Sequence, residues 1–135
     1  MVEFRFGALL ISQAETGALA EWLDQADVSL VSSDLLETEL RRMAAREGRD
    51  QVKVSAILDG VALAALDRAT YRSVGFLPMP YLRTLDALHL EAAMRLDVDA
   101  ILTYDCRLAE AARAAGLDVI APGQEQAGSV PRRAI

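Results

Sequence analysis

Short apolar runs alternate with longer helical patterns along almost the whole sequence, and this alternation most constrains the fold. The short runs are aliphatic or β-branched and are bounded by turn residues, whereas the longer segments carry Leu and Ala at helical spacing. Strands are expected at residues 2–6, 28–31, 61–66, 99–103 and 119–120, the third of them buried. Helices are expected at residues 16–23, 33–46, 51–58, 68–74, 85–96 and 106–115. Alternating strands and helices build βαβ units, so we predict an α/β fold whose mainly parallel sheet is covered on both faces.

Length and patterning predict one domain. The chain has 135 residues and contains neither an internal repeat nor a linker that would divide it. We assign residues 1–122 to a single domain and residues 123–135 to a mobile or partner-bound tail, because the tail has no hydrophobic periodicity. No run approaches the roughly 18–20 apolar residues of a membrane span, and the start lacks a signal-peptide pattern. We therefore expect a cytoplasmic protein that does not contact the membrane.

The residue counts exclude most kinds of metal site. The sequence contains one cysteine and one histidine, Cys106 and His89, which excludes a disulfide framework and a zinc site built from thiolates or histidines. A site for a hard cation must therefore consist of carboxylates. The net charge of −6 argues against nucleic-acid binding. An acidic chain is compatible with RNA only where a cation engages its carboxylates or arginines gather locally.

Two aspartates are candidates for a ligand site, which in parallel sheets lies beyond the carboxyl ends of the strands. Asp105 directly follows the strand at 99–103 and precedes a helix, although an aspartate there often serves only as an N-cap. Asp86 falls in the first turn of helix 85–96 among apolar neighbours. This turn should be well buried, and a buried carboxylate needs a partner. The alternative role for Asp86 is a favourable interaction with the helix dipole.

The helix at 33–46 carries two glutamates that have different explanations. If Asp34 is the N-cap, Glu37 occupies the third helical position, as in a capping box. Glu39 has no comparable local role, except an ion pair with Arg42 on the solvated face. Glu39 is therefore the better functional candidate. Together with the two aspartates it would form a magnesium or manganese site, if the three carboxylates converge.

Four segments in order resemble signature blocks of bacterial PIN-domain toxins of the VapC kind. They are ETGAL at 15–19, SSDLLETELRR at 32–42, LRTLDALHL at 82–90 and LTYDCRL at 102–108. The resemblance covers about residues 12–122. It implies a three-layer α/β/α PIN-like domain with a parallel sheet and a Mg²⁺-dependent endoribonuclease site, with Mn²⁺ as a possible substitute. It also implies an RNA substrate, a cognate antitoxin of a type II toxin–antitoxin pair, and a homodimer.

Carried over by position, the resemblance assigns Glu39, Asp86 and Asp105 to the second, third and fourth acidic positions of the family. These residues would act as catalytic groups and metal ligands, and Thr103 would line the same site. Arginines around the cleft would set the RNA specificity. The candidates are Arg41, Arg42, Arg46, Arg83 and Arg107.

The first acidic position of the family has no obvious counterpart. Family members open with a strand that ends in an aspartate, but here residues 1–8 read MVEFRFGA and no aspartate precedes Asp24. Glu3 lies next to the expected position and is one hypothetical replacement, although neighbouring strand residues point to opposite faces. A misread or frame-shifted start over these residues is the other explanation. Loss of this acid predicts weakened metal binding and activity.

Two further readings come from other functional classes. A catalytically inert PIN-like domain would still bind an antitoxin-type protein. A receiver-like signalling domain would need a lysine after a late strand, but the only lysine is Lys53. Two apolar helix faces are expected to pack in the core rather than to form a dimer or antitoxin groove. They consist of Leu19, Trp22 and Leu23, and of Leu36, Leu40 and Met43. The RNA target and the identity of the antitoxin are not encoded in any pattern found here.

Overall fold

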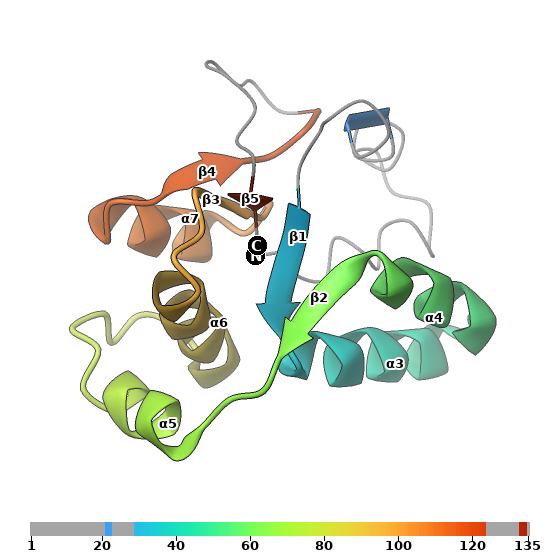
Figure 1. Ribbon diagram of the computed structural model, residues 1–135, viewed down its shortest axis with the longest axis horizontal. Helices are drawn as coiled ribbons and strands as arrows, with labels where there is room; N and C mark the ends of the chain where they lie inside the picture. Colours follow the sequence, from blue (N-terminus) through green and yellow to red (C-terminus); the bar gives the residue numbers. More distant parts are fainter. Residues whose placement is uncertain (1–20, 23–28, 124–132, 135) are drawn as a thin grey trace.

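A computed structural model describes residues 21–22, 29–123 and 133–134, and these form alternating parallel strands and helices (Figure 1). The strands are β1 (Ser29–Ser33), β2 (Val61–Ala64), β3 (Ala100–Leu102), β4 (Asp118–Ile120) and β5 (Arg133–Ala134). The helices are α3 (Leu35–Glu47), α4 (Gln51–Asp59), α5 (Arg68–Val74), α6 (Thr84–Arg95) and α7 (Cys106–Ala114). The α/β alternation expected over residues 28–120 is confirmed. The strand expected at 2–6 and most of the helix expected at 16–23 lie outside the described residues.

The five strands form one parallel sheet in the order β2-β1-β5-β3-β4. On one side β1 pairs with β2, with Leu30 opposite Val61, and on the other side β3 pairs with β4. The two-residue strand β5 lies between these pairs and contacts both β1 and β3. The sequence analysis placed residues 133–134 in a mobile or partner-bound tail, whereas the structure has them in the sheet as β5. Two residues are too few to show a periodicity that would predict a strand. Residues 124–132 lie outside the described part, so the proposed domain boundary stays a prediction.

Helices cover both faces of the sheet, and β3 shows how the two cores are separated. Leu102 packs with the buried residues of α3 and α4, whereas its neighbour Ile101 packs with those of α6 and α7. Successive strand residues point to opposite faces, so one short strand supplies both cores. Figure 1 shows α3 and α4 on one side of the sheet and α6 and α7 on the other. The predicted three-layer α/β/α arrangement is confirmed.

Helix α3 shows how the sequence builds one of these layers. Leu36, Leu40 and Ala44 follow one another at four-residue spacing and are completely buried. Each fully buried leucine contributes about 1.5–3 kcal/mol to folding. The helix ends at Gly48, whose left-handed φ of 64° favours glycine and whose backbone N–H bonds back to Ala44 and Ala45. The expectation that Leu36 and Leu40 belong to the core is confirmed.

Strand β2 differs from its expected form. Sequence patterning predicted a buried strand over residues 61–66, but β2 has four residues, of which Val61 is buried while Ala62 and Leu63 are exposed. The cause of this exposure is that β2 lies at one edge of the described sheet. An apolar run predicts that a strand exists, but it does not predict whether that strand lies at the edge of the sheet. Separately, none of the described helices is long and apolar enough to span a membrane.

Candidate active site

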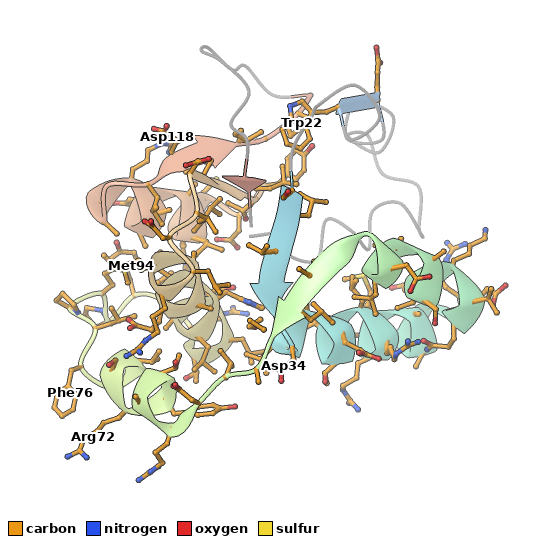
Figure 2. All side chains as sticks on the ribbon, in the orientation of Figure 1. Trp22, Asp34, Arg72, Phe76, Met94 and Asp118 are labelled. Carbon is orange, nitrogen blue, oxygen red and sulfur yellow. The ribbon has the colours of Figure 1, made fainter. Side chains whose placement is uncertain are left out.

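The carboxyl edge of the sheet brings together elements from three parts of the chain. Strand β1 ends at Ser33 and leads into α3, while β3 ends at Leu102 and is followed by α7. Because the strands are parallel, both ends lie at the same edge. Helix α6 reaches this edge as well, since its His89 lies against Ser33. Figure 2 shows Asp34 at this edge, where β1 meets α3.

A buried polar array connects α3, α6 and β1 at this edge. The ring nitrogen Nε2 of His89 donates to Oε1 of Glu39, because a carboxylate offers no proton in return. The other ring nitrogen, Nδ1, lies 3.5 Å from Oγ of Ser33. His89 and Ser33 are fully buried, whereas 26% of the Glu39 side chain is exposed. The hydrogen bond from His89 therefore fixes the Glu39 side chain, while the exposed part of that side chain remains accessible to a ligand from solvent.

Asp86 lies on α6 three residues before His89, so the two side chains share one side of the helix. Its carboxylate has no hydrogen bond or ion pair with any residue in the described part of the chain. The first turn of α6 is less buried than its apolar sequence predicts, because Asp86 is half-buried and Leu85 is 47% exposed. Asp86 is thus a carboxylate accessible to a ligand at the same edge as Glu39.

Asp105 caps α7, as the simpler of its two predicted roles required. Its Oδ1 accepts a hydrogen bond of 2.9 Å from the backbone N–H of Leu108. Its own backbone N–H donates to Oγ1 of the buried Thr103 at 3.1 Å. The bond from Leu108 orients the carboxylate through Oδ1 and does not use Oδ2. Capping does not exclude a second role, so the assignment of Asp105 to the active site stays a prediction.

The two glutamates of α3 have different roles, as predicted, but their hydrogen-bond partners are not the ones that the sequence suggested. Glu37 does not form a capping box, since the Asp34 N-cap makes no side-chain bond to the helix. Instead, Oε2 of Glu37 accepts from Nε of Arg41 at 2.8 Å. Arg41 also donates to Gln51 and Ser55, so this arginine joins α3 to α4 and is not available to a ligand in the described structure. Glu39 pairs with His89 and not with Arg42.

The predicted cation site is only partly assembled. Among the described residues, no group of three or more Asp, Glu, His or Cys side chains is close enough together to hold a metal ion. The donor chemistry is nevertheless suitable, because carboxylate oxygens are the ligands that Mg²⁺ and Mn²⁺ prefer. Asp86 has no side-chain partner among the described residues, while Glu39 and Asp105 each use one oxygen within the protein. Glu3, the hypothetical replacement for the first acid, lies outside the described residues.

Sequence reasoning did not identify the role of His89. It used the single histidine only to exclude histidine-rich metal sites. One sequence feature could have indicated a structural role for His89. Its polar ring lies in α6 among the apolar residues Leu88, Leu90 and Ala92. A fully buried imidazole needs partners for both ring nitrogens. That requirement predicts that polar groups lie nearby, but it does not identify them as Glu39 and Ser33.

Comparison with known proteins identifies the family. The family model described as PIN domain matches residues 6–114. Ribonuclease VapC35 of Mycobacterium tuberculosis is 40% identical over 125 residues, which cover 86% of this chain and 90% of the relative. Ribonuclease VapC47 of the same organism is 33% identical and covers 85% of this chain and 90% of the relative. Ribonuclease VapC46 is 36% identical, with 84% and 89% covered. No solved structure matches the chain at a significant level. The chain therefore belongs to the PIN-domain family, among the toxin ribonucleases of the VapC kind.

Proposed function

We propose that this chain is a divalent-metal-dependent endoribonuclease and the toxin component of a type II toxin–antitoxin pair. Its membership of the PIN-domain family and its resemblance to proteins named ribonucleases support this proposal. One observation carries it on the structural side. Glu39 is held by the buried His89 at the carboxyl edge of a parallel sheet. Asp86, which has no partner among the described residues, lies one helical turn from that histidine on α6.

Each acidic residue has a distinct part in the proposed site. Asp86 offers both carboxylate oxygens to a hard cation. Glu39, oriented through Oε1 by His89, presents Oε2, and Asp105, oriented by the N–H of Leu108, presents Oδ2. Mg²⁺ or Mn²⁺ held by these carboxylates would supply positive charge to the scissile phosphate and would activate a water molecule. The protein contributes preorganisation, since two of the three carboxylates are already fixed by hydrogen bonds.

Metal affinity is expected to be low. The three carboxylates do not form one cluster among the described residues, and the sequence lacks the usual first aspartate. A carboxylate that must move to bind an ion adds an ordering cost to the binding free energy. We therefore expect cleavage to require divalent cation at millimolar rather than micromolar concentration.

Replacement of Asp86 tests the proposed function. Asp86→Asn keeps the shape of the side chain but removes its charge, so we expect RNA cleavage to fall about a hundredfold or more. The matched control is Asp118→Asn, which removes an exposed aspartate at the amino end of β4, on the other edge of the sheet (Figure 2). Cleavage of a fluorogenic single-stranded RNA should respond only to the first change. Calorimetric titration with Mg²⁺ and Mn²⁺ should show weaker binding to the Asp86 variant.

The same measurements would contradict the proposal if they showed neither cation binding nor RNA cleavage. A wild-type chain that binds neither cation at millimolar concentration, and cleaves no RNA, would be a catalytically inert PIN-like domain that serves only to bind an antitoxin-type protein. Equal cleavage by wild type and Asp86→Asn would remove Asp86 from the active site.

We also propose that the protein acts as a cytoplasmic homodimer that a cognate antitoxin silences. The support is its place among the VapC-type toxins. Sedimentation velocity at micromolar concentration should give a dimer, and a single monomeric species would contradict this part of the proposal. Co-expression with the product of a neighbouring small gene should suppress RNA cleavage by the purified complex.

A further inference from the structure

Exposed aromatic side chains gather on one part of the surface, formed by α5, α6 and the loop between them. We call residues 68–85 the α5–α6 lobe. Phe76 is 81% exposed, Tyr71 is 48% exposed and Tyr81 is 43% exposed, and these are the exposed aromatic side chains of the described residues. Leu85, 47% exposed, extends the same surface. Large rings exposed together in this way usually mark a binding surface.

Arginines accompany the rings. Arg68, Arg72 and Arg83 are all exposed, and no carboxylate in the described ranges forms an ion pair with them. The lobe contains these three basic residues and no acidic one, within a chain whose net charge is −6. Figure 2 shows Arg72 and Phe76 projecting outward from this part of the molecule, away from the sheet. The lobe therefore carries both positive charge and exposed aromatic rings.

The backbone that carries these side chains is firmly anchored. Asp67 caps α5 by accepting hydrogen bonds from the N–H and the hydroxyl of Thr70. Arg95 of α6 donates to Oγ of Ser73 on α5 at 2.9 Å, which joins the two helices. In the loop, Met79 and Leu82 pack against the core formed by α6 and α7. The rings are thus held outward by a fixed scaffold, which lowers the entropy cost of binding.

The lobe adjoins the candidate active site. Leu85 directly precedes Asp86 in the first turn of α6, and Arg83 is the N-cap of the same helix. Helix α5 reaches the same region from another direction, because it follows the carboxyl end of β2. A ligand that covers the lobe therefore ends beside Asp86.

We propose that the α5–α6 lobe binds single-stranded RNA and leads the strand to the site at Asp86. Unpaired bases stack on the faces of Phe76 and Tyr81, while Arg72 and its neighbours contact phosphates. Paired bases would be hidden inside a duplex, so the surface selects single strands. This inference rests on the proposed ribonuclease function and adds the substrate class and its binding surface. It also reconciles an acidic chain with a polyanionic substrate, since positive charge is concentrated where the strand lies.

Binding without cleavage tests the lobe directly. Fluorescence anisotropy with a labelled single-stranded 12-nucleotide RNA in EDTA should give an affinity about tenfold weaker for Phe76→Ala than for wild type. Phe76→Tyr should bind as wild type does, because it keeps an aromatic face. The matched control is Val52→Ala, which removes an apolar side chain that is 73% exposed on α4, outside the lobe. Arg72→Ala should reduce the slope of log affinity against log salt by about 0.7.

The outcomes separate the lobe from the proposed function. If wild type cleaves RNA with added Mg²⁺ or Mn²⁺ but Phe76→Ala and Arg72→Ala bind RNA normally, the lobe proposal is wrong and the nuclease stands. If the lobe variants lose binding but wild type cleaves nothing with either cation, the lobe stands and the nuclease does not. If Phe76→Ala binds RNA normally but changes the oligomeric state in sedimentation velocity, the lobe is a protein interface and the proposal is overturned.

Discussion

Two polar regions at the carboxyl edge of the sheet are built in opposite ways. In the Ser33–His89–Glu39 array the serine and the histidine are fully buried, and both nitrogens of the histidine have partners within the protein. The α5–α6 lobe carries its arginines in solvent, with no carboxylate partner among the described residues. Burial makes internal pairing necessary, because an unpaired buried polar group costs free energy. Exposure removes that requirement and leaves charges available to a ligand. The buried pair His89 and Ser33 therefore fixes Glu39 in place, while the lobe is suited to binding a ligand directly.

The largest expected effect is that of His89→Ala, which tests whether the buried array stabilises the fold more than the exposed lobe does. The change removes a fully buried ring and leaves Glu39 and Ser33 without their partner, so we expect a loss of about 2–4 kcal/mol in the free energy of unfolding. Urea denaturation followed by circular dichroism measures the loss. Arg72→Ala in the lobe is the control and should stay within about 0.5 kcal/mol of wild type. A loss below about 1 kcal/mol for His89→Ala would show that the array does not stabilise the fold.

A comparison of two arginines gives a smaller effect. The Arg41 side chain contacts Glu37, Gln51 and Ser55 and joins α3 to α4, whereas the Arg72 side chain has no hydrogen-bond or ion-pair partner among the described residues. Because these contacts are partly solvent-exposed, we expect Arg41→Ala to cost only about 0.5–1 kcal/mol. The RNA affinities should change in the reverse order, with Arg72→Ala the more affected. Equal RNA affinities for the two variants would contradict the contrast between paired and available arginines.

The sequence predicted the helices and strands better than it predicted which side chains contact one another. Leu36, Leu40 and Ala44 mark α3 by their spacing, and Gly48 marks its end, because these signals are local. Partners require knowledge of the tertiary fold. Glu39 and His89 are 50 residues apart, so nothing local distinguishes their contact from the Arg42 pairing that spacing suggested.

The same limit applies to the sheet and to the site. The pairing of β5 with both β1 and β3 depends on strands about 100 and about 30 residues earlier, so no pattern within residues 123–135 reveals it. Asp86 and Asp105 were correctly placed near helix starts at the carboxyl edge. Their convergence on one ion was a prediction from resemblance, and no described three-residue cluster supports it directly.

The smallest expected effect concerns the stability of the protein at acidic pH and depends on Asp67, the residue just before the α5–α6 lobe. Hydrogen bonds from the hydroxyl and then the backbone N–H of Thr70 hold the pKa of Asp67 below its usual value of 3.8. A carboxyl group with a lowered folded-state pKa stabilises the protein above its unfolded pKa and loses this contribution as the pH falls through the folded value. Asp67→Asn keeps a capping oxygen but does not titrate. The stability advantage of wild type over this variant should therefore shrink between about pH 5 and pH 2.

Chemical denaturation at a series of pH values measures that difference. The matched control is Asp50→Asn, since Asp50 caps α4 through Val52 and shares the same side-chain chemistry outside the lobe. Parallel stability curves for wild type and Asp67→Asn across this range would show that the Thr70 contacts do not favour the charged carboxylate.

The long-range contact between Glu39 and His89 has a consequence during protein synthesis. A ribosome makes Glu39 well before it makes the 50 further residues that end at His89, which takes roughly 3–10 s at ordinary elongation rates. Until synthesis reaches α6, the nascent chain lacks both the carboxylate of Asp86 and the histidine that orients Glu39. A chain interrupted at this stage would carry no assembled site, so the order of synthesis delays any nuclease activity until most of the domain has been made.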